Sequence, residues 1–177
     1  MYTVTPPIRE ITMHYSVPTF FFTSDNHFNH TNIIKYCGRP FANVDTMNEA
    51  MIANWNNRVA PSDIVYHLGD FAMGKRELIK SIRDRLNGHI ILILGNHDQK
   101  ASYMRRQGFN EVHEELRIEV SGRGIYLRHI PNTYFDHVRN DYHLCGHVHE
   151  AWARKNNIIN VGVDVRGFTP VRLNELI

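Results

Sequence analysis

The stretch HIILILGNHD, residues 89–98, joins the longest apolar run of the chain to a group of polar side chains directly behind it. The middle of the run is apolar at every position, which is typical of a strand that is buried on both faces of a sheet. The run ends in Gly95-Asn96-His97-Asp98, where oxygen and imidazole groups follow a glycine. This junction predicts a buried parallel strand whose carboxyl end carries polar side chains that could bind a ligand or a metal ion.

Two earlier segments repeat the arrangement. Residues 19–23 are aromatic and β-prone and run into Asp25 and His27, and residues 63–68 form a second strand that is closed by Gly69-Asp70. Apolar spacing predicts helices over 45–59, 75–86 and 99–107, with Asp45 as an N-cap and Asn87-Gly88 as a C-cap. The alternation of strand and helix predicts parallel strands that are joined by helical crossovers.

The second half of the chain is rich in short strands. Residues 115–120 and 125–128 predict a hairpin around the turn at 121–124, and further strands are expected at 142–145, 158–161 and 171–173. His129 follows one of these strands, and Gly146-His147-Val148-His149 follows another. Both halves together predict an α/β fold of two sheets packed face to face, in a single domain over 1–177 with 1–18 as a lead-in segment.

The length and composition of the chain indicate which classes of protein it can belong to. The chain has 177 residues, 42% of them hydrophobic, and a net charge of +2, which disfavours a dedicated nucleic-acid binder. The longest apolar run, Ile90 to Leu94, is too short to span a bilayer, and no secretory leader is recognisable. We expect a soluble cytoplasmic protein, monomeric or homodimeric, in which Cys37 and Cys145 are free thiols.

The polar residues at the strand ends predict a metal site. The carboxyl ends of parallel strands converge on one edge of a sheet, and a glycine before a ligand permits a positive φ or a close backbone approach. Each motif alone is weak, because Asp-x-His or Gly-Asp is usually a cap or a turn. Their combination carries the prediction, and a set without thiolates suits Mn, Fe, Zn or Ni. The predicted ligands are Asp25, His27, Asp70, Asn96, His129, His147 and His149.

The ordered motifs Asp-x-His, Gly-Asp, Gly-Asn-His-Asp, His and Gly-His-x-His resemble the signature of the calcineurin-like metallophosphoesterases, over residues 19–165. Residues 24–30, 66–71 and 160–164 are similar to the small phosphoesterases of bacteria and phages. The resemblance implies a four-layered α/β/β/α sandwich. It also implies two divalent metal ions, with manganese expected first and iron, zinc or nickel as alternatives.

The resemblance further implies a role for each residue. Asp25, His27 and His149 would bind one ion, Asn96, His129 and His147 the other, and Asp70 would bridge both. His97 would protonate the leaving group, with its ring oriented by Asp98. The attacking group would be a metal-activated hydroxide that reacts with phosphorus directly, without a phospho-enzyme.

The substrate is the more open question. His30 and Arg39 lie just past the first motif and are expected to contact a phosphate or a base, the alternative being a solvated helix face. The short chain leaves no room for a lid domain, so an open site for phosphodiesters of nucleotide type is favoured. The alternatives are a phosphomonoesterase or protein phosphatase, a nuclease subunit, and a non-catalytic scaffold, which would be expected to lack a ligand or His97.

Overall fold

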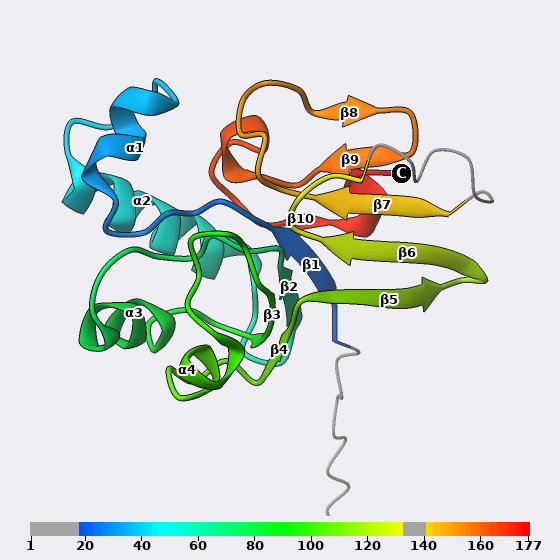
Figure 1. The fold of residues 1–177 in the computed structure, drawn as a ribbon, viewed down its shortest axis with the longest axis horizontal. Coiled ribbons are helices and arrows are strands. Elements are labelled where there is room, and N and C mark those ends of the chain that lie inside the picture. The colour runs from blue at the N-terminus through cyan, green and yellow to red at the C-terminus, as the bar shows by residue number, and fades with distance from the viewer. Residues whose placement is uncertain (1–17, 133–140) are drawn as a thin grey trace, which may run out of the picture.

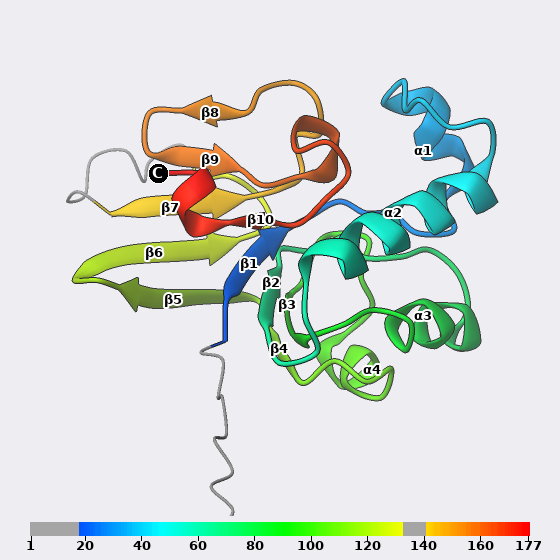
Figure 2. The same cartoon turned by 180° about the vertical axis from the view of Figure 1, so that it is seen from behind.

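The computed structural model describes residues 18–132 and 141–177, so most of the expected lead-in segment lies outside the described residues. The described chain forms two five-stranded sheets packed face to face, with helices on the outside (Figures 1 and 2). Within these ranges, no helix combines the length and the apolar character needed to cross a membrane.

The first sheet has the strand order β10-β1-β2-β3-β4. Strands β1 (Phe20–Thr23), β2 (Ile64–His67), β3 (His89–Ile93) and β4 (Glu111–His113) are parallel, and β10 (Val171–Arg172) is an antiparallel edge strand. The parallel strands with helical crossovers are therefore confirmed. Strand β4 is too short, at three residues, to have given an alternating pattern in the sequence.

Between residues 18 and 114, four α-helices precede the second sheet: α1 (Thr31–Tyr36), α2 (Val44–Arg58), α3 (Arg76–Arg83) and α4 (Ala101–Arg105). Helix α1 was not predicted. The N-cap of α2 is Asn43 rather than Asp45, because Asn43 and Thr46 form a reciprocal capping box. Helix α3 also ends earlier than predicted, with its C-cap at Asp84, and Gly88 lies in the following turn at φ +92°.

The second sheet has the order β5-β6-β7-β9-β8. Strands β5 (Glu115–Val120) and β6 (Arg123–Arg128) form the predicted hairpin, and β6, β7 (Tyr142–Cys145) and β9 (Ile158–Asn160) are parallel. Strand β8 (Arg154–Lys155) is a short antiparallel edge. Two 3-10 helices, η2 (Val163–Val165) and η3 (Leu173–Glu175), complete the described chain.

Strand β3 contributes to two apolar layers, which explains its unbroken apolar run. Ile90 and Leu92 pack toward the helices in one buried cluster, whereas Ile91 and Ile93 pack toward the second sheet in the other. The predicted α/β fold of two mixed sheets with helices is thus confirmed. In residues 18–132 and 141–177 all α-helices lie on the side of the first sheet, so these ranges show three of the four expected layers (Figure 1).

The carboxyl ends of strands from both sheets meet along one seam. Ser24 lies directly after β1, and Gly162 lies two residues after the end of β9. These two residues form a parallel β-bridge. The backbone N–H of Val163 donates to the carbonyl of Ser24 at 3.0 Å, which ties the two sheets together at this point. The loops that carry the predicted ligands all start from this seam.

Candidate metal centre

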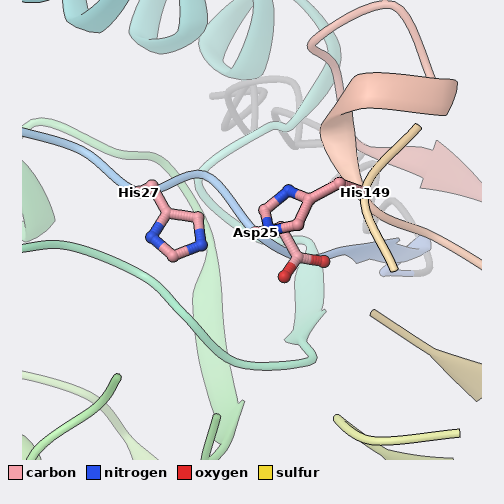
Figure 3. Close-up of side chains that lie close together, drawn as sticks. All are labelled: Asp25, His27 and His149. Carbon is pink, nitrogen blue, oxygen red and sulfur yellow. The ribbon is translucent and has the colours of Figure 1, made fainter. Parts of the chain in front are cut away.

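The seven predicted ligands come from both sheets. Asp25 and His27 follow β1, Asp70 follows β2 and Asn96 follows β3, whereas His129 follows β6 and His147 and His149 follow β7. Figure 3 shows Asp25 and His27 on one loop, with His149 reaching them from a separate segment. The structure therefore brings together side chains that are more than 120 residues apart in the sequence.

Backbone geometry at the seam is unusual. Five of the predicted ligands have a positive φ although none is glycine, a conformation that costs on the order of 1–3 kcal/mol and tends to mark functional sites. Close backbone approach explains two of the glycines, since a Cβ on Gly95 would overlap the Asp70 carboxylate and one on Gly146 would overlap Ser24 and Asp25. The positive-φ ligands are Asp25 (59°), His27 (49°), Asp70 (56°), His147 (72°) and His149 (44°).

One group of potential ligand atoms consists of Asp25, His27 and His149, which lie within 4.8 Å of one another. Both ring nitrogens of His27 are buried and have no hydrogen-bond partner among the described residues. A buried polar atom without a partner is costly, and an ion bound to one nitrogen would supply the partner that is missing. Burial lowers the pKa of His27 to about 3, so its ring is neutral, as a metal ligand must be.

A second group consists of Asp25, Asp70 and His129, again within 4.8 Å. His129 Nδ1 lies 2.7 Å from the carbonyl of Leu68, which only accepts, so Nδ1 donates and Nε2 faces the site. Nε2 lies 3.0 Å from Asn96 Oδ1 and 3.3 Å from Asp70 Oδ2, two further acceptors. Lone pairs that converge in this way require a cation between them, and both a proton and a metal ion satisfy this requirement.

The ionisation of these groups supports the same conclusion. Burial alone would lower the pKa of His129, but its hydrogen bond to Asp70 and the charge of Asp25 raise it above the ordinary value. Burial raises the pKa of Asp25 to about 6, because the carboxylate loses its hydration and faces Asp70. A bound cation would compensate the charge of these two buried carboxylates.

Asp70 occupies the position between the two groups. Its Oδ2 atom lies 3.4 Å from His27 Nε2 and 3.3 Å from His129 Nε2, while Oδ1 accepts the backbone N–H of His97 at 2.8 Å. Burial favours the neutral acid, yet the hydrogen bond and charge of His129 hold the pKa of Asp70 below its usual value. An ionised carboxylate between one histidine of each group has the geometry that a bridging ligand needs.

His147 and Asn96 complete the set. His147 Nδ1 lies 2.9 Å from Asn96 Oδ1, and its ring centroid lies 5.3 Å from that of His129. The backbone N–H of His147 also donates to the Asp25 carboxylate at 3.0 Å. The donor set of imidazole, carboxylate and amide oxygen fits divalent transition metals.

His97 lies beside this centre with an exposed side chain, its ring centroid 5.4 Å from that of His27. The expected contact between Asp98 and the His97 ring is absent from the described residues. The Asp98 carboxylate instead accepts the backbone N–H groups of Gly95, Asp70 and Phe71 at 2.8 to 3.0 Å. Asp98 therefore fixes the two ligand loops to each other rather than the ring of His97.

The expectation that Arg39 contacts the substrate is also corrected by the structure. Arg39 is 4% exposed, and its guanidinium donates to both oxygens of Asp164 at 2.7 and 3.0 Å and to the carbonyls of Asp25 and Asn26. The fifth N–H contacts Met47 Sδ at 3.5 Å, so no guanidinium donor is left for a ligand. His30, the other residue expected to contact the substrate, does lie beside the centre, because its ring centroid is 5.4 Å from that of His27.

Asp164, in η2, is the functional residue that the sequence reasoning missed. Its Oδ2 lies 2.9 Å from His149 Nδ1, so it accepts that proton and leaves Nε2 of His149 to face the centre. Burial alone would lower the pKa of His149, but the hydrogen bond to Asp164 raises it. Its place in segment 160–164, which carried part of the family resemblance, was the one available signal.

An α/β sandwich with clustered aspartate, asparagine and histidine at the seam of its sheets defines a protein with a candidate metal centre of nitrogen and oxygen ligands. A family model described as a calcineurin-like phosphoesterase superfamily domain matches residues 20–167. The chain belongs to this superfamily. Membership supports phosphoester hydrolysis as the activity and divalent metal ions as cofactors.

Three proteins with related sequences or structures place the chain among known proteins. An uncharacterised protein of Methanocaldococcus jannaschii is 37% identical over 171 residues, which cover 92% of this chain and 91% of that protein. The crystal structure of a protein of unknown function from Aquifex aeolicus matches with a TM-score of 0.71 and 28% identity, covering 90% of this chain and 97% of that one. An archaeal phosphodiesterase matches more distantly, with a TM-score of 0.48, 17% identity and coverage of 81% and 82%.

Proposed function

We propose that this protein is a phosphodiesterase that acts on nucleotide-type diesters and holds two divalent ions, manganese first among them. The proposal places one ion at Asp25, His27 and His149 and the other at Asn96, His129 and His147, with Asp70 between them. The two groups of ligand atoms that share Asp25, one with His27 and His149 and one with Asp70 and His129, support two adjacent sites rather than one, with Asp70 placed between them. We also propose that the chain is a single domain.

The preference for diesters rests on the space around the centre. A cavity of about 380 Å³ opens beside His27, His97, His147 and His149, and a separate one of about 270 Å³ opens beside Asn96 and His129. A phosphate held between them has room for an ester group on each side. A monoester has one such group and would leave the second cavity empty.

Divalent ions bound at the centre would supply Lewis-acid stabilisation of phosphate charge and lower the pKa of a water molecule. The chain itself fixes the ligand orientations through Asp98, Asp164 and Arg39, which hold the loops and one imidazole. His97, exposed beside His27, is the group placed to give a proton to the departing oxygen, a role that contributes typically about 10²- to 10⁴-fold in rate.

The test is a paired hydrolysis assay. Metal-stripped protein is reconstituted with Mn, Fe(II), Zn, Ni or Mg and supplied with bis(4-nitrophenyl) phosphate and 4-nitrophenyl phosphate in parallel. Metal-dependent turnover with a higher kcat/KM for the diester is expected. A preference for the monoester would replace the proposal with a phosphomonoesterase, and no turnover with two ions bound would favour the scaffold alternative.

The structure offers a matched pair of variants for this assay. Asp70→Asn removes the carboxylate between the two groups, whereas Asp84→Asn removes an exposed carboxylate that pairs with Lys80 on α3. Only the first is expected to abolish the metal-dependent rate. Equal rates in the two variants would contradict the assignment of the centre.

A further inference from the structure

The larger of the two cavities has a second wall that the proposed chemistry does not use. One wall consists of the histidines of the centre, and the other comes from α1 and from the loop after β7. The residues of this second wall are His30, Ile33, Tyr36, Cys37, Val148 and Glu150. Tyr36 is 67% exposed, although it is a large aromatic residue at the end of a helix.

The aromatic rings form a series that leads outward from the centre. The His27 and His30 ring centroids lie 5.4 Å apart, and those of His30 and Tyr36 lie 6.1 Å apart at an interplanar angle of 78°. The Tyr36 ring packs edge-on against His30 and remains largely exposed to solvent. A flat group attached to a phosphate at the centre would reach this ring, whereas a methyl group would not.

The charges along this second wall indicate what kind of substrate group can bind beside it. Of the described residues that line the cavity, none is lysine or arginine, and Glu150 adds a carboxylate. Burial, the charges of Asp164 and Glu150 and a hydrogen bond to Glu150 raise the pKa of the Cys37 thiol to about 12, so the neutral thiol lies beside Ile33 and Val148 and donates to Glu150. On this second wall a further phosphate would find no lysine or arginine and would face Glu150, so an uncharged group fits the wall better.

We propose that this cavity is a nucleobase subsite, so that the substrate is a diester of a single nucleoside with one phosphate. The base stacks on Tyr36 and lies over Ile33 and Val148. Glu150 accepts a hydrogen bond from an exocyclic amine, which favours guanine, adenine or cytosine over uracil. This inference rests on the proposed phosphodiesterase function and excludes nucleoside triphosphates and long nucleic acid as preferred substrates.

The first experiment measures discrimination between two diesters that share a leaving group: guanosine 5′-(4-nitrophenyl) phosphate and methyl 4-nitrophenyl phosphate. Base stacking on an aromatic side chain contributes enough that Tyr36→Ala is expected to lower the kcat/KM ratio of the two about tenfold. Tyr36→Phe keeps the ring and is expected to keep the ratio. Lys35→Ala, on the adjacent exposed residue of α1, is the matched control.

The second experiment measures binding without turnover. Isothermal titration of the metal-loaded protein with guanosine and uridine 5′-monophosphates is expected to show tighter binding of the former, and Glu150→Ala is expected to remove the difference. A wild-type ratio near one for the two diesters, or equal ratios in Tyr36→Ala and Lys35→Ala, would overturn the subsite.

The failure of the subsite and of the proposed function are distinguishable. A protein that hydrolyses methyl 4-nitrophenyl phosphate but does not prefer the guanosine diester is a phosphodiesterase without this subsite. If neither diester is hydrolysed, the phosphodiesterase proposal fails. The titration then decides alone, and equal affinity of Tyr36→Ala and wild type for guanosine monophosphate would overturn the inference.

Discussion

Substitution of Asp164 by asparagine tests the buried contact that links three parts of the candidate centre. The Asp164 carboxylate accepts Arg39 Nε at 2.7 Å, Arg39 Nη2 at 3.0 Å and His149 Nδ1 at 2.9 Å, and the side chains of Asp164 and Arg39 are 3% and 0% exposed. Asparagine has nearly the same shape but carries no charge. The guanidinium would remain buried without its counter-ion.

Two effects of different origin are expected. Removing one partner of a buried ion pair costs about 3–5 kcal/mol, a large share of the typical stability of a domain, and the loss appears in denaturant unfolding of the metal-free protein. Loss of the hydrogen bond that orients a ligating histidine weakens metal binding by about 10- to 100-fold, which calorimetric titration with Mn²⁺ measures.

A double variant separates the two effects. Arg39→Met combined with Asp164→Leu removes both charges, so part of the unfolding free energy is expected to return, because no unpaired charge remains. Metal affinity is expected to stay low, since His149 still lacks its acceptor. Glu49→Gln, which breaks an exposed pair with Arg85, is the control for removal of an arginine partner and is expected to change neither quantity measurably.

The reasoning would be refuted by an Asp164→Asn protein whose unfolding free energy and Mn²⁺ affinity both equal those of the wild type. A loss of stability with unchanged Mn²⁺ affinity would support the stabilising ion pair of Arg39 and Asp164 but exclude a role of Asp164 in orienting His149. Recovery of metal affinity in the double variant would show that strain from the unpaired Arg39, rather than the orientation of His149, had weakened binding.

Three further outcomes are expected. His97→Ala should retain both ions by elemental analysis and lose most rate with poor leaving groups; an equal loss with a nitrophenol leaving group would exclude the proton-donor role. Asp70→Asn should lose both ions together, so two ions per chain in that variant would disprove a bridging position. His67 accepts the N–H of Gly69 at Nδ1 and lies 2.9 Å from Asn26 Oδ1 at Nε2, so its ring is neutral, and burial lowers its pKa to about 3. The unfolded chain then binds a proton near pH 6.5 that the folded chain does not, so stability should fall as pH decreases from about 6.5 toward 3, by up to about 1.4 kcal/mol per pH unit. Denaturant unfolding of the metal-free protein at pH 7 and 5 measures this slope; a His67→Gln protein with the same slope would contradict the assignment.

The parts of the fold that the sequence predicted correctly have strong local patterns. Strand β3 is apolar throughout because it is buried between helices and the second sheet, and the hairpin of β5 and β6 has an obvious turn. The missed elements are short. Helix α1 has six residues and β4 three, and their partners, not their own sequences, stabilise them.

The predicted ligands were recognisable because each follows a strand. The carboxyl ends of parallel strands lie at the same edge of a sheet, so the place of each ligand in the sequence indicated its place in the fold. The roles of Arg39 and Asp98 were not recognisable in the same way. Arg39 meets Asp164 at a separation of 125 residues, and Asp98 accepts backbone N–H groups that have no side-chain signature. The first contact depends on how the two sheets dock and the second on how two loops of the first sheet meet, and no local pattern in the sequence records either.

The seam between the sheets has a consequence for folding. The two groups of ligand atoms that contain Asp25 each combine residues of both sheets, His149 with Asp25 and His27, and His129 with Asp25 and Asp70. An ion bound at this seam would hold the two halves of the chain together. A half that folds alone would provide only some of the ligands of each ion. Since a ligand that binds only the docked state shifts the equilibrium toward it, metal uptake during refolding would report the moment at which the sheets join, and chelation would loosen that junction first.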